Sequence, residues 1–332
     1  MDAKDTNPFQ WRNEGKQFKL GDEDDIGVTA MISTDDSMLF VLRKSIHSVR
    51  LADSVDPDRT NPAIPDIKQK ILSFGSNDPF VGRTLLQANT LFAPNCLDER
   101  IDCTKALSIA LSFLKEIIAL REMKSSYIAE DGEKNSSFVG KTGEDSSLNL
   151  PSMDKVEQQT KQFIINTDHA VRHIIELTQL FYPEIKSGGW AKLLLDKLKQ
   201  ERGADNPCTQ FVESINPPIW LTRNLRNAIE HPTQSDKVLI QNYRLLQTGK
   251  VKPPTISYEH PDANLSEIPV SQFMSLSLEN IVICFEELMV HFCNIHAAPF
   301  AGDTRSVVEI PETARSPHET HVRFGYQIAW TK

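Results

Sequence analysis

The sequence has few cysteines and no long apolar run, and both shortages narrow the class of protein. Its five cysteines are scattered, odd in number and never paired as Cys-x-x-Cys, which argues against a disulfide framework. No apolar stretch approaches the roughly 20 residues that span a bilayer. The polar first residues lack the basic-then-apolar layout of a signal peptide. These absences predict a soluble, cytoplasmic protein that makes no membrane contact.

An excess of basic residues is also lacking. Lysine and arginine together number 36 against 45 acidic residues, so the formal net charge is -9. Proteins that coat nucleic acid without specificity are usually basic, because neutralising phosphates supplies most of that affinity. The balance disfavours such a coat but is compatible with a local basic cleft. The length of 332 residues and 39% hydrophobic content suit a folded chain of two domains.

The first third of the chain is predicted to be helical. Residues 1–33 carry an acidic run and form an irregular lead-in. Apolar residues then recur at helical spacing as far as Lys124, which predicts an N-terminal helical domain over residues 34–124. The helices expected there cover residues 38–51, 66–76, 79–93 and 98–124.

Residues 125–154 change to serine, glycine and charged residues, which predicts a flexible linker or long exposed loop. Within it, Gly140-Lys141-Thr142 matches the tail of a phosphate-binding loop. Asn135 stands where that loop needs its first glycine, so the linker interpretation is favoured.

A second domain is predicted over residues 155–332, mostly as a helical bundle. The expected helices cover residues 155–182, 190–202, 208–214, 218–231, 234–247 and 274–296. The expected strands cover residues 255–260, 306–310 and 322–328, and they are predicted to pair as one small sheet. The fold class predicted is therefore mainly α, with an N-terminal helical domain, a helical bundle and a small β element near the C-terminus.

The helix over residues 218–231 carries the sharpest chemical signal of the sequence. Arg223, Asn227 and His231 recur every four residues along one flank. Arg226 lies about 140° around an ideal helix from His231, so the two side chains do not stand side by side. Because a residue before proline is pushed out of the α region, the helix is expected to stop just before Pro232.

These residue types suit a phosphodiester. A guanidinium such as that of Arg226 pairs with phosphate oxygens, and asparagine amides donate hydrogen bonds. Histidine relays protons near neutral pH, which makes His231 a candidate acid or base. Arg223 and Asn224 on the same flank are candidate substrate-binding residues.

The pattern of Arg226, the polar Asn227, three further residues and His231 resembles the motif of the HEPN superfamily. The resemblance covers roughly residues 155–300. Many members of that superfamily are dimeric, metal-independent endoribonucleases, in which a ribose 2′-hydroxyl attacks the adjacent phosphate. The resemblance implies that His231 is the acid or base, Arg226 the phosphate partner and Asn227 an orienting amide, with neither a metal nor a cofactor.

The leading hypothesis is therefore an RNA-cleaving homodimer of the toxin or defence kind, whose N-terminal domain binds a regulatory protein partner. The alternative is a non-catalytic helical interaction module or a nucleotide-binding module. In it, Arg226 and Glu230 form a surface pair and His231 caps the helix. A metal pair at His169 and His173 has the right spacing but no evident third ligand, so a solvated helix face is favoured there.

Overall fold

The chain is a mixture of helices and antiparallel sheets. It is 48% helical and 18% strand, with four small sheets in its described residues, so the prediction of a mainly α fold is wrong. The computed structural model describes residues 8–15, 17–22, 24–25, 27–35, 37–138, 147–233, 236–260 and 263–329. The glycine-lysine-threonine stretch at 140–142 lies outside these ranges. Two compact units divide the chain, one of Met1–Leu111 with Cys293–Lys332 and one of Ser112–Phe292.

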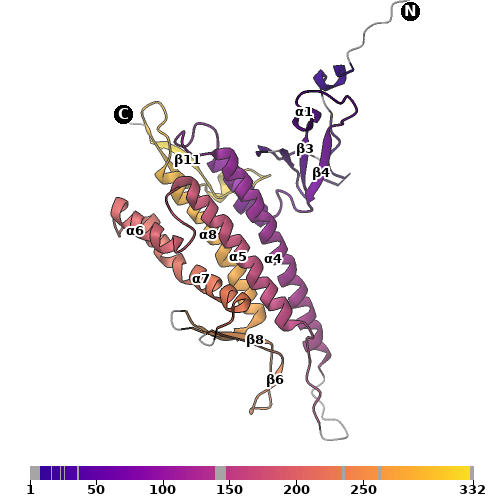
Figure 1. The fold of residues 1–332 in the computed structure, drawn as a ribbon, viewed down its shortest axis with the longest axis vertical. Coiled ribbons are helices and arrows are strands. Elements are labelled where there is room, and N and C mark those ends of the chain that lie inside the picture. The colour runs from indigo at the N-terminus through magenta and orange to yellow at the C-terminus, as the bar shows by residue number, and fades with distance from the viewer. Residues whose placement is uncertain are drawn as a thin grey trace, which may run out of the picture. The chain divides into compact units, whose positions relative to one another are not determined.

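The first unit contains a four-stranded antiparallel meander in the order β1-β2-β3-β4. Its strands are β1 (Ala30–Ser33), β2 (Met38–Val41), β3 (Ile46–Arg50) and β4 (Ile67–Leu72). Figure 1 labels its strands β3 and β4. Between β2 and β3, the Leu42 N–H donates to the Ser45 carbonyl at 2.9 Å and closes a tight turn. The face that is buried carries Ile32, Leu39, Val41 and Ile46.

This sheet replaces the helices predicted over residues 38–51 and 66–76. Burial along β2 follows the two-residue repeat of a strand, whereas the sequence was assigned the period of a helix. Apolar residues in so short a run satisfy both periods. The turn residues Arg43 and Lys44 carry none of the glycine or asparagine signals that usually mark a hairpin.

The rest of the first unit includes a helical stretch and a second sheet. The stretch runs through α2 (Pro79–Val81), the π-helical turn η2 (Gly82–Leu86) and α3 (Gln87–Leu91), as the sequence predicts for residues 79–93. Strands β10 (Thr304–Glu309) and β11 (Phe324–Ala329) pair antiparallel. The predicted pairing of the two C-terminal stretches is therefore confirmed.

The predicted irregular lead-in contributes a buried ion network to this unit. The short helix η1 (Gln10–Asn13) carries Arg12, which is 8% exposed. Its guanidinium lies 3.2 Å from Asp53 and 3.2 Å from Asp56, and it donates to the Asn61 carbonyl at 2.7 Å. Asp53 belongs to the short helix α1 (Ala52–Val55). Arg12 therefore joins the start of the chain to the segment that follows β3.

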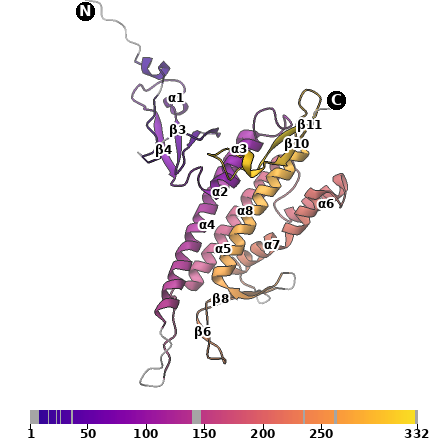
Figure 2. The ribbon, with the colours of Figure 1, turned by 180° about the vertical axis from the view of Figure 1, so that it is seen from behind.

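Three long helices, most of whose residues belong to the second unit, lie side by side, and Figure 2 shows them from behind. They are α4 (Cys103–Ser137), α5 (Val156–Phe181) and α8 (Val270–Ile295). The rings of Phe113 and Phe285 stack with their centroids 3.9 Å apart between α4 and α8. None of the helices within the described ranges has both the length and the apolarity needed to cross a membrane.

Helix α4 continues to Ser137, through the first part of the predicted linker. Alanine, glutamate and lysine in this segment favour a helix, and Tyr127 is fully buried. The Tyr243 hydroxyl also donates to the Asp131 carbonyl at 3.1 Å. Helix-favouring residues and tertiary contacts thus extend α4 through a segment for which a linker was predicted.

Helices α6 (Trp190–Arg202) and α7 (Pro207–Glu230) complete the helical part of this unit. Two helices were predicted where α7 is continuous, because the pair Pro217-Pro218 was taken as a helix start. The true start is Asn206, whose side chain accepts the Cys208 N–H at 3.0 Å ahead of a proline at the first helical position. Buried residues on both sides of the two internal prolines keep the helix against its neighbours.

A three-stranded sheet of order β5-β8-β9 and a two-stranded ribbon of β6 and β7 follow α7. Their bounds are β5 (Lys237–Gln241), β6 (Arg244–Leu245), β7 (Val251–Lys252), β8 (Thr255–Glu259) and β9 (Leu265–Pro269). The strand predicted over residues 255–260 is confirmed. The helix predicted over 234–247 is wrong, and β8 pairs with β5 and β9 rather than with the C-terminal stretches.

Candidate functional site at the end of helix α7

Helix α7 presents the motif residues on its last two turns. It ends at Glu230, and His231 adopts a non-helical conformation with its N–H still donating to the Asn227 carbonyl at 2.7 Å. The expected stop before Pro232 is therefore confirmed. The His231 side chain is exposed at the helix end.

A buried carboxylate on α5 gathers three arginines beside this helix. Asp168 is 3% exposed, and its Oδ2 accepts from Arg172 Nη2 at 3.0 Å. The Nε of Arg226 lies 3.8 Å from Oδ2, and the Nε of Arg223 lies 3.9 Å from Oδ1. Even with Glu230 paired to Arg226, three guanidinium groups face two carboxylates, and the remaining positive charge suits an anionic ligand.

Arg226 is further held by its own helix. Its Nη1 donates to Asn227 Oδ1 at 3.1 Å, and its Nη2 forms an ion pair with Glu230. No hydrogen bond or ion pair in the described part of the chain joins Arg226 to His231. One copy of the chain therefore keeps these two side chains apart, as their angular separation on the helix requires.

A cavity of about 480 Å³ lies along α7 and the start of α6. Arg223, Asn224 and Asn227 line it from α7, whereas Arg226 and His231 do not. Trp190 and Trp220 also line it, and Trp220 is 44% exposed. The cavity therefore combines the exposed indole of Trp220 and the buried Trp190 with three asparagine amides and a guanidinium.

The first turn of α6 adds backbone donors to this cavity. Gly189 precedes the helix in the left-handed region, and no side chain caps the N–H groups that follow. Lys192 lines the same cavity. An uncapped helix N-terminus with a nearby cation attracts anions. Aromatic faces, amides and anion-binding groups together match the base and phosphate of a nucleotide.

No separate signal in the sequence marks Trp190 or Trp220, or the burial of Asp168. Each belongs to the apolar or polar pattern of its own helix, and only the packing of α5 and α6 against α7 brings them together. The Gly188-Gly189 pair before Trp190 was the one local sign of an uncapped helix start.

The paired histidines on α5 do not assemble a metal site. His173 Nδ1 lies 2.8 Å from Glu176, and the described residues include no group of three potential metal ligands. Their helical spacing places them on a partly exposed face of α5.

Replacing Asp168 with asparagine should destabilise the chain by about 1–3 kcal/mol, because charged hydrogen bonds contribute about that much. Three guanidinium groups would then lack their shared carboxylate. Urea unfolding monitored by circular dichroism measures the change. Asp205→Asn, an exposed acidic residue of the same unit, is the matched control. Equal midpoints for the two variants would show that Asp168 does not organise the arginines.

Comparisons of the chain with models of protein families, with curated proteins and with solved structures give no significant match.

Proposed function

We propose that the chain binds single-stranded RNA along α6 and α7 and cleaves it with Arg226 and His231. The observation that carries this proposal is the cavity lined by Arg223, Asn224 and Asn227 beside two tryptophans, on the same two turns as the motif. A base stacked on Trp220 would meet amide donors at its edge. The phosphates would meet Arg223, Lys192 and the backbone donors of α6.

In the proposed reaction, His231 accepts the proton of a ribose 2′-hydroxyl. The 2′-oxygen forms a bond to phosphorus as the bond from phosphorus to the 5′-oxygen breaks. Water protonates the leaving 5′-oxygen, and His231 releases its proton to solvent. Arg226 binds the phosphate oxygens, whose negative charge concentrates in the transition state. The products carry a 2′,3′-cyclic phosphate and a 5′-hydroxyl.

The active unit proposed is a homodimer. Within one copy, Arg226 is bound to Glu230 and Asn227, and no hydrogen bond or ion pair among the described residues joins it to His231. A second copy facing the end of α7 would bring its exposed His231 to Arg226 of the first. The resemblance of Arg226, Asn227 and His231 to the HEPN motif supports this arrangement, since members of that superfamily join both copies of the motif.

The ion pair between Arg226 and Glu230 favours a second candidate, a nucleotide-binding module without cleavage. In that case the pair is a surface contact, and His231 serves only as the residue that ends α7. The cavity lined by Trp190 and Trp220 would then bind a nucleotide that is not cleaved.

Incubating the purified chain with end-labelled single-stranded RNA in the presence of a chelator separates the two candidates. Cleavage with 2′,3′-cyclic phosphate ends is expected. Binding of the RNA without cleavage, by a chain that light scattering shows to be dimeric, would favour the second candidate. If the chain neither binds nor cleaves the RNA, both candidates are refuted.

A further inference from the structure

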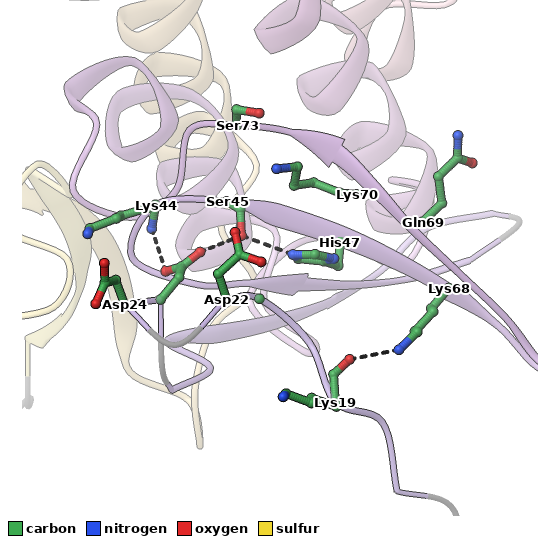
Figure 3. A pocket seen from close by; sticks show the side chains of 12 residues that line it. Lys19, Asp22, Asp24, Lys44, Ser45, His47, Lys68, Gln69, Lys70 and Ser73 are labelled. Atoms are coloured by element: carbon green, nitrogen blue, oxygen red, sulfur yellow. Dashed lines mark hydrogen bonds between the residues drawn. The ribbon is translucent and has the colours of Figure 1, made fainter.

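A second cavity, of about 550 Å³, lies in the first unit against strands β3 and β4 (Figure 3). Its lining is almost wholly polar or charged, and it contains no aromatic ring other than the imidazole of His47. A nucleobase therefore finds no stacking surface here. The cavity instead offers four lysines, three aspartates and this imidazole to a ligand.

The inner wall of the cavity is a chain of three buried polar side chains. Asp25, Ser45 and His47 are 4%, 5% and 9% exposed. Asp25 Oδ1 accepts the Lys44 N–H at 2.8 Å, and Oδ2 accepts the Ser45 hydroxyl at 2.5 Å. The Ser45 oxygen also lies 3.0 Å from His47 Nε2.

The number of protons determines which group donates in each hydrogen bond between Asp25, Ser45 and His47. Ser45 has one hydroxyl proton, which it donates in its hydrogen bond to Asp25. The Ser45 oxygen must therefore accept a hydrogen bond from Nε2–H of His47. Ser45 is therefore not a nucleophile activated by histidine. The second ring nitrogen, Nδ1, has no hydrogen-bond partner among the described residues.

Burial lowers the pKa of His47, and Lys70 acts in the same direction while Asp25 opposes it. A neutral ring with its proton on Nε2 leaves Nδ1 as an acceptor, suited to a hydroxyl donor. The asymmetry of the imidazole thus gives the cavity one directional acceptor at its inner wall.

The lysines of the cavity supply positively charged hydrogen-bond donors. Lys70 stands opposite His47 across the β3–β4 ladder, and Lys68 is two residues away on the same face of β4. Lys68 Nζ donates to the Lys19 carbonyl at 3.0 Å. Within the described ranges, no carboxylate lies within ion-pair distance of Lys44 or Lys70. These two ammonium groups are therefore available to an anion.

Gly21, Asp22, Asp24 and Asp25, which precede β1, form one wall of the cavity. Gly21 has a φ of 72°, and a Cβ there would lie 2.6 Å from the Asp25 carbonyl oxygen and 2.6 Å from Leu42. The Asp25 N–H also donates to the Asp22 carbonyl at 3.0 Å. Asp22 and Asp24 are thereby held at the cavity, where their carboxylates can accept hydroxyl donors.

We propose that this cavity binds a small sugar phosphate. Lys44 and Lys70 bind the phosphate oxygens, as ammonium groups commonly do. Asp22, Asp24 and His47 Nδ1 accept hydrogen bonds from the sugar hydroxyls. A cavity of this size accommodates such a ligand. The binding site belongs to the first unit and does not depend on RNA cleavage by α7.

The test is titration calorimetry of the full chain with ribose 5-phosphate, glucose 6-phosphate, ribose and inorganic phosphate. At least one sugar phosphate is expected to bind more tightly than inorganic phosphate, and ribose alone to bind weakly. Lys44→Gln and Lys70→Gln should each weaken that sugar phosphate about tenfold, since each removes one charged contact. Lys105→Gln, an exposed lysine of the same unit, should leave the affinity within about twofold of wild type, since it removes no contact to the ligand.

His47→Gln tests the contacts to the sugar separately from the contacts to the phosphate. The glutamine amide can donate to Ser45 but has no acceptor atom at the position of Nδ1. The variant should therefore weaken the sugar phosphate and leave inorganic phosphate unchanged. Unfolding midpoints without ligand verify that each variant is folded. The proposal is overturned if neither sugar phosphate binds, or if the cavity variants bind as tightly as Lys105→Gln.

Discussion

Arg226→Ala and His231→Ala should each lower the rate of RNA cleavage at least about 100-fold. Removing a positioned acid or base typically costs a factor of that size, and so does removing a group that stabilises transition-state charge. His231 is exposed, so its loss should leave the unfolding midpoint almost unchanged. Initial rates on a labelled single-stranded RNA measure the effect.

The matched control for these variants is His173→Ala, a histidine on α5 that pairs with Glu176 and does not line the cavity of α7. It should cleave at the wild-type rate. If Arg226→Ala and His231→Ala also cleave at that rate, the motif is not the catalytic centre, whatever RNA the chain binds.

Mixing the two inactive variants tests the homodimer. A dimer of one Arg226→Ala copy and one His231→Ala copy contains one site with an intact arginine and an intact histidine, if each site draws them from different copies. Activity should then return in the mixture. Sites formed within one copy would stay inactive in every dimer, so an inactive mixture would contradict the shared site.

Gly75→Ala should destabilise the chain by about 3 kcal/mol or more, the upper range for overpacking a buried site. A Cβ at this position would lie 2.1 Å from the Leu42 carbonyl oxygen and 2.6 Å from the Arg43 carbonyl carbon. The neighbouring Ser76 N–H donates to that same Leu42 oxygen at 2.8 Å. The backbone after β4 thus lies directly on the β2–β3 turn and cannot move away without breaking this contact.

Gly132→Ala provides the opposite control. Gly132 lies within α4, and a Cβ there meets nothing within 4 Å. Alanine should stabilise the helix by about 0.5–1 kcal/mol, because glycine loses more backbone freedom on folding. Denaturant midpoints of both variants measure the contrast. A tolerated alanine at position 75 would show that the close approach of the two backbones is not required.

Long amphipathic helices could be predicted from this sequence, and the short strands of the β1–β4 meander could not. Helices α5, α6 and α8 follow apolar periodicities of several turns, and Pro232 marks the end of α7. The meander from β1 to β4 offers only four to six residues per strand, over which helix and strand periods coincide. Its β2–β3 turn also lacks glycine, so no local signal in the sequence distinguished a pair of strands from a helix.

The candidate site was predictable only as far as one helix determines it. The positions of Arg223, Asn224 and Asn227 on a common flank follow from their spacing, and the structure places all three along one cavity. The positions of Asp168 and Trp190 depend on how α5 and α6 pack against α7. The periodicity of a single helix contains no information about that packing.

The buried Arg12 makes the start of the chain sensitive to trimming. Hydrogen bonds from the Asn61 and Thr60 N–H groups, together with Arg12, hold the pKa of Asp56 at about 2. A depressed carboxyl pKa stabilises the fold above the unfolded pKa, and that contribution disappears as the pH falls toward 2. A protease that removed Arg12 would take away one of these partners, so the shortened chain would unfold at a less acidic pH than the whole one.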